Sequence, residues 1–187
     1  MTKKDQKLEA LYHYFISNGF DHTIEEIAQG IGVTKKTLFN RYENREGMEK
    51  SVMDHWHQVL LSRFYNKCQF CNNAIEKIVI FVCEIKLSYH NETQFFTKNF
   101  AQKPITISAI FSKTLYEIIQ EGIQTKCIDD ETAVNIYIPY FFHNIIDYFL
   151  LLKPEKQATI LQYLIQPVLT SRGVEMMQEI ELENLIG

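Results

Sequence analysis

The apolar residues of this chain recur every three or four positions along most of its length, and this spacing is typical of amphipathic helices. The first such stripe consists of Leu8, Leu11, Tyr12 and Phe15. The chain has only 7 glycines and 4 prolines among 187 residues, about half of their usual share. Because tight turns need these residues, the composition disfavours a β-sandwich, a barrel or a glycine-rich nucleotide-binding sheet. We therefore expect an all-α fold.

Cap and turn residues divide the N-terminal part into short helices. Gly19 offers a left-handed stop for the first helix. Thr23 and Glu26 have the spacing of a capping box, which opens a second helix, and Gly32 ends that helix after about two turns. Thr34 is placed to cap a third helix. The N-terminal part is therefore predicted to be a cluster of small helices.

The spacing of Ala28, Gly32 and Leu38 agrees with a helix-turn-helix. Such a motif needs a small residue where its two helices touch, a residue that tolerates positive φ in the turn, and an aliphatic residue under the second helix. An ordinary helical hairpin has a similar pattern without binding DNA, so the spacing leaves both interpretations open. A fourth helix follows the cap at Asn44, with an apolar stripe at Met48, Val52, Trp56, Val59 or Leu60, and Phe64.

The outward face of the predicted third helix favours DNA binding over a face that only meets solvent. It carries Lys35, Lys36, Thr37, Asn40 and Arg41. Arginine and lysine can read guanine in the major groove, asparagine can read adenine, and threonine suits a phosphate or a thymine methyl group. Residues 33–45 have a local charge of +3, although the first 50 residues are neutral and the chain carries −4.

The stretch from Gly19 to Val52, GFDHTIEEIAQGIGVTKKTLFNRYENREGMEKSV, resembles the DNA-binding region of TetR-family transcriptional regulators. The matching features are the GF before the capping box, EEIA, GVTKKTLF, and the aromatic-x-x-basic-Glu start of the fourth helix. The resemblance covers roughly Leu8 to Trp56. It implies a three-helix DNA-binding head over residues 1–46, joined by the fourth helix to a helical ligand-binding and dimerisation body over residues 47–187.

The resemblance also implies a set of DNA-binding residues. Asn40 and Arg41 fall where base-reading and backbone-touching side chains are usual, and Arg45 falls where a cation can hold a phosphate. Lys36 replaces a residue that is commonly small, and Phe39 stands where a tyrosine is typical. The full set is Thr34, Lys35, Lys36, Thr37, Phe39, Asn40, Arg41 and Arg45.

Caps and prolines also mark the helices expected in the body. One helix opens at Asn72 or Asn73, and another at Pro104, which suits a first helical turn. The remaining helices are predicted over residues 129 or 130 to about 152, with a kink at Pro139, over 154–170, and over 174–186.

Residues 130–152 are apolar on nearly all sides, which predicts burial on more than one side. Tyr137, Phe141, Tyr148 and Leu161 would otherwise form an unusually large exposed apolar patch. We therefore expect a homodimer. The resemblance implies that the last two long helices of each subunit pair as a four-helix bundle.

Polar side chains in apolar helices of the body mark a candidate effector site. Ligand cavities are mostly apolar with a few convergent polar groups, although hydrogen-bonded core residues follow the same pattern. The 13 phenylalanines and 10 tyrosines favour an apolar or aromatic small-molecule effector. The candidates are Tyr89, His90, Tyr140, His143, Asn144 and Asp147.

Several function classes are disfavoured. The sequence has no GxSxG, P-loop, HExxH or GxGxxG motif, so we expect no enzyme activity and no cofactor. Cys68 and Cys71 form a lone CxxC without the second pair of a structural zinc site; we interpret them as incidental, with metal or redox sensing as the alternative. No secretory or lipid-facing segment is evident, which predicts a cytoplasmic protein without membrane contact.

These observations predict a dimeric, sequence-specific DNA-binding transcriptional regulator. The simplest version is a repressor that a small-molecule effector releases from a pseudo-palindromic operator in double-stranded DNA. The alternative is a helical small-molecule-binding protein or enzyme in which residues 1–50 are only a structural bundle. A third possibility is a regulator that binds DNA constitutively and has no effector.

Overall fold

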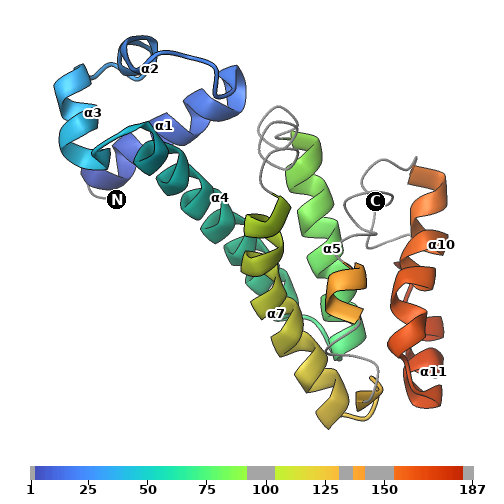
Figure 1. The fold of residues 1–187 in the computed structure, drawn as a ribbon. Helices are drawn as coiled ribbons and strands as arrows, with labels where there is room; N and C mark the ends of the chain where they lie inside the picture. The colour runs from blue at the N-terminus through green and yellow to red at the C-terminus, as the bar shows by residue number, and fades with distance from the viewer. Residues whose placement is uncertain (1–2, 92–103, 131–136, 142–153, 183–187) are drawn as a thin grey trace. The chain divides into compact units, whose positions relative to one another are not determined.

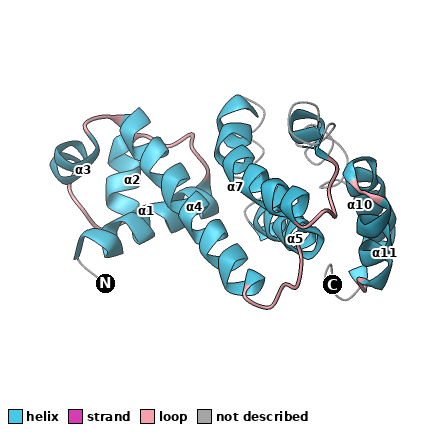
Figure 2. Cartoon of the chain, turned by 90° about the horizontal axis from the view of Figure 1, so that it is seen from below, coloured by secondary structure: helices cyan, strands magenta, loops and turns pink. Residues whose placement is uncertain are grey.

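The computed structural model of this chain describes residues 3–91, 104–130, 137–141 and 154–182. Its elements within these ranges are helices (Figures 1 and 2), apart from a single isolated bridge between Ile128 and Leu169. The predicted all-α fold is confirmed. The helices are α1 (Lys3–Asn18), α2 (Ile24–Gly30), α3 (Lys35–Tyr42), α4 (Arg45–Cys68), α5 (Ala74–Asn91), α7 (Pro104–Gln124), α10 (Pro154–Ile165), the short 3₁₀ helix η3 (Gln166–Val168) and α11 (Ser171–Glu179).

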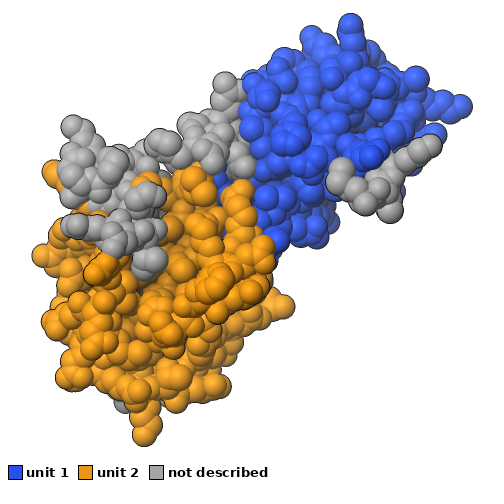
Figure 3. All heavy atoms as spheres, turned by 180° about the vertical axis from the view of Figure 1, so that it is seen from behind, with its two compact units in different colours: residues 1–62, 88–104 blue, residues 63–87, 105–187 orange. Residues whose placement is uncertain are grey.

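The chain divides into two compact units (Figure 3). The first unit contains residues 1–62 and 88–104, and the second contains residues 63–87 and 105–187. Helix α4 starts in the first unit and ends in the second. The functional boundary that we expect after residue 46 stays a prediction.

The first unit has the predicted caps. Gly19 adopts a φ of 77°, and its N–H donates to the Phe15 carbonyl at 2.8 Å. Phe20 then folds back, and its ring stacks on Phe15 with the centroids 4.5 Å apart. The Thr23–Glu26 capping box opens α2, since each side chain accepts a hydrogen bond from the other residue's backbone N–H. The backbone and hydroxyl of Thr23 thereby lower the pKa of Glu26.

Helix α2 ends in a Schellman motif that turns the chain toward α3. The N–H of Val33 donates to the Ala28 carbonyl at 2.9 Å, and the N–H of Gly32 donates to Gln29 at 3.2 Å, the two bonds that define this motif. Gly32 has a φ of 67°, which glycine adopts at little cost. The predicted turn is therefore confirmed, and it supplies a glycine where a side chain would be strained.

The core of the second unit includes phenylalanines from three helices. Phe64 of α4 meets Phe81 of α5 edge-on at a centroid distance of 5.2 Å, and Phe81 meets Phe111 of α7 at 5.6 Å. All three side chains are buried. Asn73 is the residue that caps α5, because its side-chain oxygen accepts the N–H of Glu76 at 2.9 Å. Helix α7 begins at Pro104, as expected.

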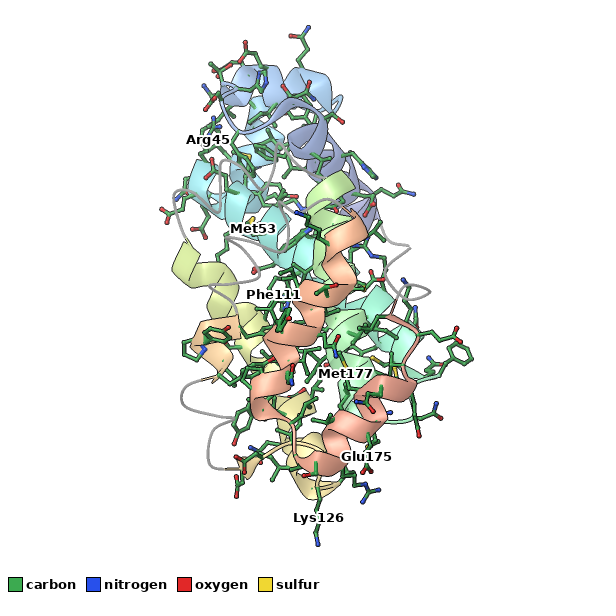
Figure 4. All side chains as sticks on the ribbon, turned by 90° about the vertical axis from the view of Figure 1, so that its right-hand side faces the viewer. Arg45, Met53, Phe111, Lys126, Glu175 and Met177 are labelled. Atoms are coloured by element: carbon green, nitrogen blue, oxygen red, sulfur yellow. The ribbon has the colours of Figure 1, made fainter. Side chains whose placement is uncertain are left out.

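The C-terminal helices differ from the prediction. The helix expected over residues 154–170 ends at Ile165, because Pro167 cannot donate to a continuing α-helix and lies in the 3₁₀ turn η3. Thr170 instead caps α11, accepting the Gly173 N–H at 3.1 Å, so the tail helix begins at Ser171 and not at Val174. Met177 of α11 is buried, whereas Lys126 is exposed (Figure 4).

The prediction of an exposed apolar patch on the single chain is wrong for three of its four residues. Tyr137 has an exposed fraction of 2%, and Phe141 and Leu161 have 0%, so the chain itself covers them without a partner. These three residues therefore give no support for a dimer. Tyr148, the predicted kink at Pro139 and most of the helix expected over residues 130–152 lie outside the described residues or depend on them.

Candidate nucleic-acid interface

The local sequence of α3 decides which of its side chains face outward. Its N-cap is Thr34, whose hydroxyl accepts the Thr37 N–H at 3.2 Å and lies 2.9 Å from the Thr37 hydroxyl. Leu38 and Tyr42, four residues apart, are buried and fix the inner face. The helix therefore presents its other side chains to solvent: Lys35, Lys36, Phe39 and Asn40 are exposed, and Thr37 and Arg41 are partly exposed.

Lys35 is held by contacts within the first unit. Its ammonium donates to the Glu25 carboxylate of α2 and lies 5.7 Å from the centroid of the exposed Phe39 ring, within range of a cation–π interaction. The hydrogen bond from Lys35 lowers the pKa of Glu25, so this carboxylate stays ionised at neutral pH. An anionic side chain thus competes for one of the predicted DNA-binding cations.

Lys36 and Asn40 have no such competition. They lie four residues apart on one face of α3, and both are exposed. Neither side chain makes a hydrogen bond or ion pair with the described residues. Arg41 lies over the ring of Tyr42, with its guanidinium carbon 5.3 Å from the centroid. The side chains of Lys36 and Asn40 are therefore available to an external partner.

Arg45 is the first residue of α4, where the sequence places it, but its side chain already has partners within the first unit. Its Nε donates to Glu49 at 2.8 Å, one turn along α4, and its guanidinium also donates to the His22 carbonyl ahead of α2. The side chain is only about one-third exposed. Arg45 thus ties the start of α4 to the segment before α2, and phosphate binding would have to compete with these two contacts.

The junction between α3 and α4 is tighter than the sequence indicates. Glu43 has φ 63° and ψ −50°, and the Asn44 N–H donates to the Tyr42 carbonyl at 2.7 Å, which makes a strained γ-turn. Asn44 then caps α4 by accepting the Gly47 N–H at 2.8 Å. A Cβ atom at Gly47 would overlap the Tyr42 carbonyl oxygen. The orientation of α3 at this junction therefore depends on a glycine that we did not single out.

Solved structures of other proteins share the fold of this chain over nearly its whole length. The ligand-free structure of RolR matches with a TM-score of 0.70 and 11% identity, covering 96% of each chain. The transcriptional regulator FadR from Bacillus subtilis, in complex with stearoyl-CoA, matches with a TM-score of 0.66 and 20% identity, over 89% of this chain and all of that one. A transcriptional regulator from Cytophaga hutchinsonii matches with a TM-score of 0.66 and 15% identity, over 90% of this chain and 99% of that one.

The chain has the TetR-type fold. No protein-family model and no curated protein matches the sequence, so the fold is established by structure. Within this TetR-type fold the helix-turn-helix consists of α2, the Gly32 turn and α3. The structure brings seven of the eight predicted DNA-binding residues together on α3 and its N-cap, and it places the eighth, Arg45, at the first residue of α4.

The candidate effector residues are less well placed by the structure. Tyr140 is 44% exposed, Tyr89 and His90 lie on α5 with side chains outside the described set, and the remaining three lie outside the described residues: His143, Asn144 and Asp147. A different cleft of about 340 Å³ lies between α4, α5 and α7 of the second unit. None of the six candidates lines this cleft; its residues include Phe64, Tyr65, Cys68, Lys77, Ile118 and Glu121.

The described residues offer no obvious centre for other chemistry. No group of three or more histidine, cysteine, aspartate or glutamate side chains among them could hold a metal ion. None of the described helices combines the length and the apolar character that crossing a membrane requires.

Proposed function

We propose that this protein is a sequence-specific DNA-binding transcriptional regulator and not an enzyme. The observation that carries the proposal is the solvent-facing surface of α3, where Lys36 and Asn40 lie uncommitted in a helix-turn-helix of the TetR-type fold. In this role α3 enters the major groove, Asn40 reads a base edge, and Lys36 neutralises a phosphate. The DNA-binding function is assigned to residues 1–46, with Thr34, Lys35, Thr37, Phe39 and Arg41 completing the contact surface.

The active species in this proposal is a homodimer. Two copies of α3 related by a two-fold axis would enter successive major grooves of a pseudo-palindromic operator. Tyr163 of α10, which is 64% exposed, and Tyr140, which is 44% exposed, are candidates for the apolar surface that the subunits share. The predicted cytoplasmic location agrees with this function.

Regulation by a small molecule that binds residues 47–187 completes the proposal. The similar regulators RolR and FadR have been solved with resorcinol and with stearoyl-CoA, respectively, which supports an apolar or aromatic effector. Such a molecule releases DNA only if it binds the DNA-incompatible state more tightly, and a difference of a few kcal/mol is enough. A repressor released by its effector is the simplest form of this mechanism.

Selection of bound duplexes from a random DNA pool tests the proposal directly. We expect enrichment of a two-fold-symmetric site, because each subunit reads one half-site. Recovery of no sequence, together with no salt-dependent binding to any duplex, would contradict DNA binding. Enrichment of an asymmetric single half-site would instead contradict the dimer and leave the role of α3 intact.

Alanine variants of the two uncommitted residues should have different effects on DNA affinity. Lys36→Ala should weaken binding to all sequences and reduce the slope of log K against log salt by about one per bound subunit, so by about two for a dimer. Asn40→Ala should relax preference at one base position by about 1–3 kcal/mol. Fluorescence anisotropy with the selected duplex, its single-base variants and a salt series measures both effects.

Lys113 provides the matched control for charge. Its side chain is 82% exposed on α7 of the second unit, so Lys113→Ala removes the same charge outside the proposed DNA-binding unit and should leave the salt slope unchanged. If Asn40→Ala lowered the affinity for every duplex equally, Asn40 would not read a base.

Glu25 should lower the affinity of the protein for DNA. In Glu25→Gln the Lys35 ammonium loses its anionic partner, and the repulsion between Glu25 and phosphate disappears. We therefore expect about two- to tenfold tighter binding to any duplex and a steeper salt dependence. In a Lys35→Ala background the gain should be smaller, and an equal gain in both backgrounds would show that the Lys35–Glu25 pair is irrelevant to binding.

A further inference from the structure

Cys68 and Cys71 lie at the two ends of a tight turn in the second unit. Cys68 is the last residue of α4, and the Cys71 N–H donates to its carbonyl at 3.1 Å. Such a four-residue turn brings its end Cα atoms within about 7 Å, and disulfides span Cα separations of about 4.4–6.8 Å. The backbone therefore already holds the two cysteines close to a separation that a disulfide can bridge.

The two thiols are close enough to influence each other's ionisation: Cys71 raises the pKa of Cys68, whereas Cys68 opposes the rise at Cys71. Both side chains are partly exposed. Burial is the main cause that raises the pKa of Cys68, to about 12, and it also raises the pKa of Cys71. Cys71 is therefore the better nucleophile of the pair, and Cys68 is placed to react second.

We propose that Cys68 and Cys71 form a reversible disulfide by exchange with a small-molecule disulfide, which makes this turn an oxidation site. Cys71 loses its proton and attacks one sulfur of the small disulfide, forming a mixed disulfide and releasing one thiolate, which takes up a proton. Cys68 then loses its proton and attacks the Cys71 sulfur, releasing the second thiolate. The protein loses two protons and two electrons, and the small disulfide becomes two thiols.

Few groups around this pair stabilise the thiolate form of either cysteine. Lys77, whose charge lowers the pKa of both thiols, places its ammonium 2.6 Å from both Glu121 oxygens, so its charge is largely neutralised. Strongly oxidising disulfides arise where the reduced thiolate is stabilised, and the opposite condition holds here. The disulfide should therefore form slowly, because little thiolate is present, and should persist once formed.

The site has a local consequence. The Cys68 side chain lines the cleft of about 340 Å³ that also contains Lys77 and Glu121. A disulfide removes the Cys68 thiol as a hydrogen-bond donor at this wall and ties the end of α4 to the segment that leads into α5. Oxidation should therefore change which small molecules the cleft accepts.

Equilibration of the full chain in glutathione redox buffers tests the proposal. The fraction of the 68–71 disulfide is measured by acid quenching, alkylation and peptide mass mapping, once in native buffer and once in concentrated urea. We expect an equilibrium constant for disulfide formation at least about tenfold larger in the folded protein. By linkage, the oxidised protein should also resist urea better than the reduced protein by the same factor.

The remaining cysteines provide the controls. Cys127 is fully buried and Cys83 is partly exposed on α5, and neither belongs to the turn, so the double variant Cys83→Ser/Cys127→Ser should form the 68–71 disulfide as readily as the natural chain. Cys71→Ser should abolish the intramolecular disulfide. An equilibrium constant that is equal or smaller in the folded state would overturn the proposal, as would stable glutathione adducts on Cys71 without closure to Cys68.

Discussion

Replacement of both Arg63 and Lys67 by alanine is expected to lower the free energy of unfolding by about 3–5 kcal/mol. The two cations come from α4 and approach Glu84 of α5: the Arg63 Nε lies 3.0 Å from one carboxylate oxygen, and the Lys67 Nζ lies 2.6 Å from the other. The Glu84 side chain is fully buried, so the double variant leaves an uncompensated charge in the core. Urea denaturation followed by circular dichroism measures the loss.

Glu84→Leu is the informative comparison. It replaces the buried carboxylate with an apolar side chain of similar volume, and such replacements are often neutral or stabilising. The unfolding free energy of Glu84→Leu should therefore stay within about 1 kcal/mol of that of the natural chain or exceed it. If Glu84→Leu cost as much as the double alanine variant, the ion cluster itself would be a net source of stability.

Gly47→Ala is expected to destabilise the first unit by about 1–3 kcal/mol, the usual cost of an added atom in a packed site. The new methyl group would overlap the Tyr42 carbonyl oxygen, which is backbone and cannot rotate away. The junction would have to open, and α3 would shift with it. Thermal unfolding measures the destabilisation, and DNA affinity should fall further than the fraction of unfolded protein explains.

Glu43→Gly at the same junction should have the opposite effect on stability. Glycine adopts the φ of 63° seen at Glu43 without the strain of about 1–3 kcal/mol that other residues meet in such regions, although it adds about 0.4–1 kcal/mol of backbone entropy to the unfolded state. We therefore expect a small net stabilisation. A lower melting temperature for Glu43→Gly would show that the γ-turn is not strained.

The parts of the fold that could be predicted are those that nearby residues determine. The Thr23–Glu26 box, the Gly32 turn and the Thr34 cap each join atoms within a few positions of the sequence. The exposed face of α3 follows from the same logic, because burying Leu38 and Tyr42 leaves only one way for the helix to turn. The fold and the surface of the candidate interface were therefore accessible from the sequence.

The features that sequence analysis missed join residues far apart in the chain or depend on backbone clashes. Lys77 meets Glu121 across 44 positions, and nothing near either residue indicates the other. Glu84 lies on a helix whose apolar stripe gives no sign of a buried carboxylate. The burial of Tyr137 and Phe141 by the chain itself could not be distinguished from burial by a partner, because an apolar pattern reports burial but not what covers it.

Helix α4 runs for 24 residues from Arg45 to Cys68 as a single element, about 36 Å at the usual rise. Its first residue secures the segment before α2, and its last belongs to the cysteine turn. The helix contains no proline or glycine after Gly47, so its sequence provides no kink site along most of its length. Bending α4 beyond Gly47 therefore requires breaking hydrogen bonds of the helix itself.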